Sequence, residues 1–255
     1  MKKNLLLGII TLMGGSLLTA YAGPKDDVQS AVTALGSAAN YTWQTTVDMG
    51  ADSPFQPGPT DGKTEKDGFT TVTMSFGDNS SEVVFKGTNA AVKTADNGWQ
   101  TMAEALDAGG GGGGGGFNPG MMIVRQAQNI KVPAVEVTNL VALAGDLKVD
   151  GDKITGDLSQ DGVKSMMAFG GRGGRGRRGG GGGPGGGNGP DITNPKGTVT
   201  FWLTDGKLTK YASHVSGTMS FGGNDRDIDR TTTVVISNVG STKVEVPDDA
   251  KKKLQ

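Results

Sequence analysis

Residues 198–219 read TVTFWLTDGKLTKYASHVSGTM, and this stretch decides the fold class. Apolar and polar side chains alternate along it, which is the pattern of a β-strand with one covered face and one face in water. Asp205-Gly206 interrupts the alternation and predicts a tight turn between strands over 198–204 and 207–219. A third strand is expected over 228–239, so the chain should close with an antiparallel meander.

The same alternation predicts strands earlier in the chain. Strands are expected over 41–49 and 69–76, and a hairpin is expected around Gly87-Thr88-Asn89, between 81–86 and 90–94. A second hairpin should turn at Asp150-Gly151-Asp152, within 146–157. Residues 52–67 are rich in Pro, Gly and charge and predict a loop, and the charged stretch 225–230 predicts a turn. Residues 243–246 are expected to add a short edge strand.

Helices are predicted between these strands. Val28, Val32 and Leu35 share one helical face, and Pro24 suits the first helical position. Ser159 is expected to cap a short helix that ends near residue 169. The predicted helices cover residues 24–39, 99–108, 118–130, 133–144 and 159–169. Together the elements predict an α+β fold: one strongly curved antiparallel sheet covered by helices.

The first 22 residues have the layout of a secretory signal peptide. Lys2-Lys3 precedes a mostly apolar stretch from Leu5 to Leu18, and Ala20-Tyr21-Ala22 fits a cleavage site before Gly23. The apolar stretch is shorter than the roughly 20 residues that cross a bilayer. We therefore expect an exported, soluble protein, either periplasmic or secreted, without a transmembrane segment in its mature chain.

Two glycine-rich tracts, residues 109–116 and 170–189, interrupt the expected fold. Neither contains enough apolar surface to offset the entropy of ordering it, so both are predicted to be disordered. Long insertions add little loop-closure entropy, so residues 23–255 are expected to form a single domain around them. The chain has no Cys, which excludes disulfides and an acylated cysteine at the signal junction.

The order of segments resembles the LolA-like family of envelope proteins, which includes periplasmic lipoprotein carriers and mycobacterial lipid-binding lipoproteins. The similar places are a helix before the aromatic strand NYTWQ at 40–44, the segment DNGWQ at 96–100, and TFWLTDGKLTKY at 200–211. The strand 231–239 followed by Val244-Glu245-Val246-Pro247 resembles the family's final strand. The resemblance implies an incomplete β-barrel with an apolar cavity for acyl chains beneath helices.

The candidate cavity residues are the large apolar side chains expected on the covered face of the sheet. They could equally fill a solid core, because large apolar side chains are mostly buried in either case. The resemblance also implies an arginine that closes the helical lid, and the sequence assigns no residue to this role. The candidates are Trp43, Val47, Val72, Met74, Phe76, Phe85, Phe201, Leu203, Val234 and Ile236.

The second glycine tract contains a cluster of arginines, Arg172, Arg175, Arg177 and Arg178. Flexible Arg-Gly segments bind single-stranded nucleic acid through charge and stacking, but an exported protein meets anionic lipid or polysaccharide more often. Three uses stay open: a spacer, a contact with an anionic envelope surface, and nucleic-acid binding, in decreasing order of preference. Outside this tract the mature chain has a net negative charge and no general attraction to polyanions.

No residue pattern indicates catalysis, a metal or a cofactor. His214 is the single histidine, and it lies within a predicted strand without Cys or a second His to build a zinc site. The glycine runs lack the Gly-Lys-Ser/Thr of a phosphate loop, and no Gly-x-Ser-x-Gly elbow is present. The resemblance to the LolA-like family implies instead a non-enzymatic protein that binds an apolar or amphiphilic ligand, such as a lipid or a lipoprotein acyl chain, and this is the function we predict. The alternative is a structural module that contacts anionic surfaces through its Arg-Gly tract; a hydrolase is a distant third.

Overall fold

A computed structural model describes residues 23–51, 53, 56–76, 79–94, 98–110, 119–168, 191–221 and 224–255. The predicted signal peptide and the four arginines of the Arg-Gly tract lie outside these residues, as do most of both glycine tracts. The helices are α1 (Pro24–Ser37), α2 (Met102–Gly110), α3 (Pro119–Asn129), α4 (Pro133–Leu143), α5 (Gln160–Ala168) and α6 (Asp248–Lys253).

All strands belong to one open antiparallel sheet of 11 strands, in the order β6-β5-β4-β3-β2-β1-β11-β10-β9-β8-β7. Two meanders meet where β1 pairs with β11, with Trp43 opposite Ile236. The strands are β1 (Asn40–Asp48), β2 (Thr60–Glu65), β3 (Phe69–Phe76), β4 (Asn79–Lys86), β5 (Asn89–Thr94), β6 (Gly98–Thr101), β7 (Lys148–Asp150), β8 (Lys153–Asp157), β9 (Asp191–Thr204), β10 (Lys207–Phe221) and β11 (Asn224–Ser237).

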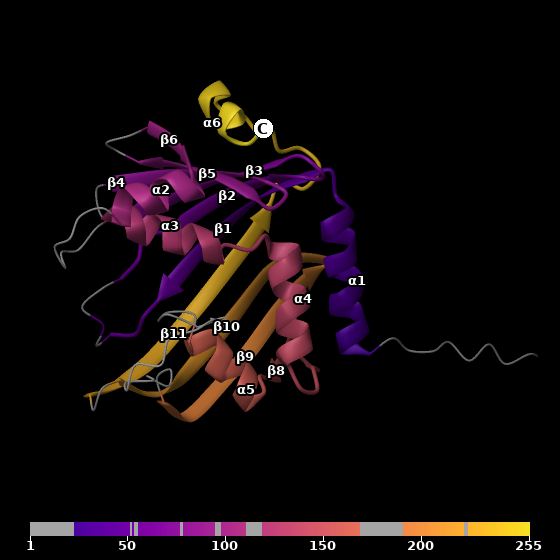
Figure 1. Cartoon of the computed structure of the whole chain (residues 1–255). Helices are drawn as coiled ribbons and strands as arrows, with labels where there is room; N and C mark the ends of the chain where they lie inside the picture. The colour runs from indigo at the N-terminus through magenta and orange to yellow at the C-terminus, as the bar shows by residue number, and fades with distance from the viewer. Residues whose placement is uncertain are drawn as a thin grey trace, which may run out of the picture.

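Five helices cover one face of this sheet, which we call the inner face (Figure 1). The helices α1, α4 and α5 lie over β9 and β10, whereas α2 and α3 lie against β5 and β6. Inward side chains of both meanders, such as Val83 and Phe201, join buried residues of these helices in one core. The predicted fold class, an incomplete barrel covered by helices, is therefore confirmed.

A smaller core lies on the opposite, outer face of the first meander. Ala250 and Leu254 of α6 pack against Val84 and Ala91, which point outward from β4 and β5. Figure 1 shows α6 on the other side of the sheet from α2 and α3. An ion pair of 2.9 Å between Lys253 and Glu104 links α6 to α2 around the sheet edge. The strands β3–β5 are thus covered on both faces.

The expected loop over 52–67 was wrong in its second half, because residues 60–65 form β2. The strand exists because it pairs with β1 on one side and β3 on the other. Gly62 lies directly under the indole of Trp43, where a Cβ would come within 2.0 Å of the ring. A residue type that disfavours strands is therefore required here by tertiary packing.

Three further expectations were wrong at element boundaries. Residues 98–101 form the edge strand β6, so the helix that was expected from 99 begins only at Met102 and runs to Gly110. The charged stretch 225–230 belongs to β11, because its carboxylates accept hydrogen bonds from hydroxyls of β10: Thr218 donates to Asp227 over 2.7 Å. Residues 243–246 form no strand and lead instead into α6. The other predicted helices and hairpins are present. The predicted cap of α5 is present too, because the Gly162 amide donates a hydrogen bond to the Ser159 hydroxyl.

Candidate functional site

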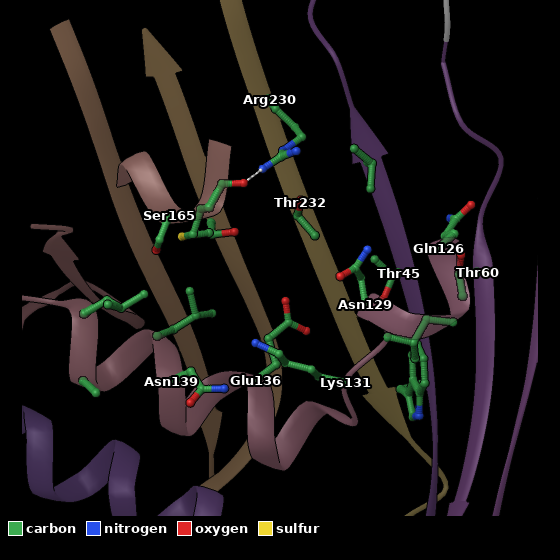
Figure 2. A pocket seen from close by; sticks show the side chains of 18 residues that line it. Thr45, Thr60, Gln126, Asn129, Lys131, Glu136, Asn139, Ser165, Arg230 and Thr232 are labelled. Carbon is green, nitrogen blue, oxygen red and sulfur yellow. Dashed lines mark hydrogen bonds between the residues drawn. The ribbon is translucent and has the colours of Figure 1, made fainter. Parts of the chain in front are cut away.

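A cavity of about 510 Å³ lies between the inner face of the sheet and the helices α3, α4 and α5. Its size falls within the range of pockets that hold one small-molecule ligand. Figure 2 shows the side chains around it, with Thr45, Thr60 and Thr232 on the strands and Asn129, Glu136, Asn139 and Ser165 on the helices. Its apolar lining is formed by Trp43, Val47, Ile130, Leu140, Ala142, Leu143 and Met166.

The floor of the cavity is made of short polar side chains. Ser213 of β10 and Thr232 of β11 are opposite each other in the register, and Thr45 and Thr60 form the same kind of pair between β1 and β2. These side chains reach only a short way from the sheet. A space therefore remains between these side chains and the helices above them. Over other parts of the sheet, longer apolar side chains fill the corresponding space.

Trp43 forms one wall of the cavity and is almost completely buried, with 3% of its surface exposed. Gly62 leaves room for the flat ring, and the indole Nε1 donates to the Thr64 hydroxyl over 3.1 Å. A ring held by packing and by a hydrogen bond gives the cavity a rigid apolar surface.

Glu136 of α4 brings a carboxyl group into the cavity. Its Oε2 accepts a hydrogen bond from the buried Tyr211 hydroxyl, with an O–O distance of 2.6 Å. Burial raises the pKa of Glu136, and this effect outweighs the Tyr211 hydrogen bond and the nearby Lys131, which lower it. Burial, together with the adjacent carboxylate, also raises the pKa of Tyr211 well above its ordinary value. Glu136 and Tyr211 therefore both keep their protons to a higher pH than they would in water.

Arg230 of β11 reaches from the sheet toward α5. Its Nη2 donates to the main-chain oxygen of Met166 over 2.8 Å, as Figure 2 shows. Arg230 is partly buried, and this burial lowers the pKa of its guanidinium. The contact ties the lower part of the helical cover to the sheet floor.

The structure brings two of the ten candidate cavity residues, Trp43 and Val47, to the cavity. Five others are buried in the core around it, and Phe85 and Leu203 pack against that core while partly buried. Phe76 ends β3, and its side chain is outside what the structure describes. The five core residues are Val72, Met74, Phe201, Val234 and Ile236.

Sequence reasoning missed the polar half of the cavity. Arg230 was placed in a turn, although extending the alternation backward from Val234 through Thr232 places it on the inner face. Glu136 lies one helical turn before the buried Leu140, a position that also faces the sheet. In both cases a charged residue occupies a position that its spacing from buried apolar residues predicts to face inward.

His214 lies apart from the cavity, on β10. Its Nε2 is 2.7 Å from a carboxylate oxygen of Asp229 on the neighbouring strand. Within the described ranges, no group of three or more His, Asp or Glu side chains could hold a metal ion.

No family model matches this chain, and no curated protein matches its sequence. Among solved structures, the Mycobacterium tuberculosis lipoprotein LppX matches with a TM-score of 0.42 and 13% identity over 87% of this chain and 97% of LppX. LprF from Mycobacterium bovis matches with a TM-score of 0.42 and 13% identity, over 89% and 97% of the two chains. A LolA superfamily protein from Nitrosomonas europaea gives a TM-score of 0.32 and 7% identity, over 89% and 96%.

The last of these proteins carries the name of the family that the sequence resembles. The open curved sheet with helices on its inner face agrees with the LolA-like architecture implied by that resemblance. In the part of the chain that the structure describes, no helix is both long and apolar enough to span a membrane.

Proposed function

We propose that this chain is an exported, non-enzymatic envelope protein that binds an amphiphilic ligand in the cavity between sheet and helices. The observation that carries the proposal is the cavity itself, with a volume of about 510 Å³ and a lining that combines an apolar wall with polar groups. Export is supported by the signal-peptide pattern of residues 1–22.

The mixed lining favours an amphiphile over a purely apolar ligand. Trp43, Leu140 and Met166 offer apolar surface to an acyl or alkyl chain. Glu136 and Arg230 would lose hydration against such a chain, and a polar head group can replace that water. A ligand with one apolar and one polar end satisfies both parts of the lining.

A matched pair of variants on β11 tests this proposal. Thr232 points into the cavity, and Thr233 points to the outer face of the same strand. In Thr232→Phe the new ring should fill the cavity and weaken the binding of an apolar fluorescent naphthylamine probe. Thr233→Phe should bind the probe as tightly as the parent does. Equal probe binding by all three proteins would contradict a ligand site in this cavity.

Native mass spectrometry of the protein purified from its own envelope provides an independent measurement. The parent and Thr233→Phe should carry a co-purifying lipid, and Thr232→Phe should carry less. A protein without lipid that still binds anionic vesicles would favour the alternative, an interaction module that acts through the Arg-Gly tract.

A further inference from the structure

Arg230 is a partly buried cation that has no ion-pair partner among the described residues. Among the described residues, no carboxylate lies within 4.0 Å of its guanidinium, and the recorded ion pairs use other cations. Taking a charge out of water is unfavourable unless an opposite charge or a full set of hydrogen bonds replaces the water. Partial burial removes some of that water from Arg230, so the position favours an anionic partner, which the described part of the chain does not supply.

The guanidinium also keeps unused donors. It has five N–H groups, and among the described residues it makes one hydrogen bond, to Met166. No buried side-chain nitrogen or oxygen in that part of the chain lacks a hydrogen bond, so the remaining donors are accessible rather than sealed in the core. Arg230 lines the cavity, and this space is where its donors can meet a ligand.

The protonation state of Glu136 affects how well the cavity suits an anion. Beside Arg230, the lining contains one carboxyl group, Glu136. Glu136 already accepts the Tyr211 hydroxyl, and burial favours its neutral form. The positive charge of Arg230 is therefore opposed least when Glu136 is protonated.

We propose that the cavity binds a single-chain amphiphile with an anionic head group, a carboxylate or a phosphate, which is seated on the Arg230 guanidinium. The planar fork of arginine matches two oxygens of either group. Thr232, two residues along the same strand, and Ser213, opposite it on β10, offer further hydroxyls on the floor of the same cavity. The alkyl chain lies along the apolar wall formed by Trp43, Leu140 and Leu143.

This inference rests on the proposed function, and matched ligands separate the two. Dodecanoate, dodecyl phosphate and dodecan-1-ol share one chain and differ in the head group. Each is titrated at pH 8 below its micelle concentration against protein loaded with the naphthylamine probe. The parent should bind the tighter of the two anions roughly 10- to 100-fold better than the alcohol, the range for hydrogen bonds to a charged group.

Arg230→Met should reduce the affinity for both anions to that of the alcohol and leave the alcohol affinity unchanged. The matched control is Arg226→Met, which removes an exposed arginine from the same strand outside the cavity lining. Circular dichroism checks the fold of each variant. If Arg230→Met does not fold, Arg230→Lys keeps the charge without the fork and should retain part of the preference.

The outcomes separate the two proposals. Equal binding of all three ligands by the parent would overturn the anionic head group and leave an apolar site standing. A preference that survives in Arg230→Met, or in Arg230→Lys at full size, would also overturn the role of the guanidinium. Failure of every ligand to displace the probe would reject the cavity as a ligand site. The tighter of the two anions identifies the head group as carboxylate or phosphate.

Discussion

The two halves of the sheet are built differently, although both are antiparallel meanders. In the first half, β3–β5 are covered by α2 and α3 on the inner face and by α6 on the outer face. In the second half, helices cover β9–β11 on the inner face, and outward side chains such as Val235 remain about half exposed, at 46%. The cavity lies at the join, over β1, β2, β10 and β11.

The difference shows what opens a cavity in this fold. The inner face of the first half presents Val72, Met74, Val83 and Val92, all buried against the helices. At the join, the inner face presents hydroxyl side chains such as Ser213 and Thr232. Short polar side chains neither fill the space nor exclude a polar ligand group, so the change of residue type along the sheet produces the site.

The largest difference between the filled inner face and the cavity is expected from two methionine truncations. Met74 of β3 is fully buried in the filled half, and Met166 of α5 lines the cavity while partly exposed. Met74→Ala should lower the free energy of unfolding by about 2–5 kcal/mol, the usual loss for a large side chain in a core. Met166→Ala should cost about 1 kcal/mol or less, because part of its surface already faces open space. Urea unfolding measures both losses. Equal losses would contradict the difference between a filled inner face at Met74 and an open cavity at Met166.

Gly62→Ala should have the next largest effect, because the new Cβ would lie within 2.2 Å of two ring atoms of Trp43. We expect a loss of about 1–3 kcal/mol in the free energy of unfolding, together with weaker probe binding as the cavity wall shifts. The control is Gly36→Ala, where the Cβ would make an ordinary 3.6 Å contact with Ala134. An unchanged free energy of unfolding in Gly62→Ala would show that Trp43 does not need this close approach.

Glu136→Gln should change how the free energy of unfolding depends on pH. Because the folded pKa of Glu136 is raised, its contribution to stability is complete below the unfolded pKa and is lost as pH rises through the folded pKa. Gln keeps an acceptor for the Tyr211 hydroxyl and does not titrate. The variant should therefore gain stability relative to the parent as pH rises from about 4 to 8. Thermal melts across this range measure the difference; a constant difference would mean that the carboxyl is hydrated.

The smallest effect is expected from the Arg-Gly tract. Four arginines near an anionic leaflet contribute roughly 4 kcal/mol at most, and salt screens this attraction. Replacing Arg172, Arg175, Arg177 and Arg178 by Ser should abolish weak vesicle binding at low salt and leave probe binding in the cavity unchanged. Vesicle co-sedimentation measures the first quantity. Undiminished binding by the Ser variant would leave the tract as a spacer.

Local patterns were sufficient to predict most elements of the sheet and helices. Alternation identified β1, β3 and the hairpin of β9 and β10, because a strand with one covered face must repeat every two residues. Pro133 and Ser159 marked the starts of α4 and α5 for equally local reasons, since they suit a helix N-terminus. These features depend only on neighbours along the chain, so they could be predicted without the tertiary structure.

The strand β2 and the cavity were decided by tertiary structure. The segment TDGKTE has little strand preference, and it becomes β2 because β1, β3 and the Trp43 ring surround it. Likewise, no local pattern reveals that Thr232, Glu136 and Arg230 share a space, because they come from two distant segments of the chain. A cavity is the volume left between packed elements, and that volume depends on how the helices sit on the sheet as much as on which residues face inward.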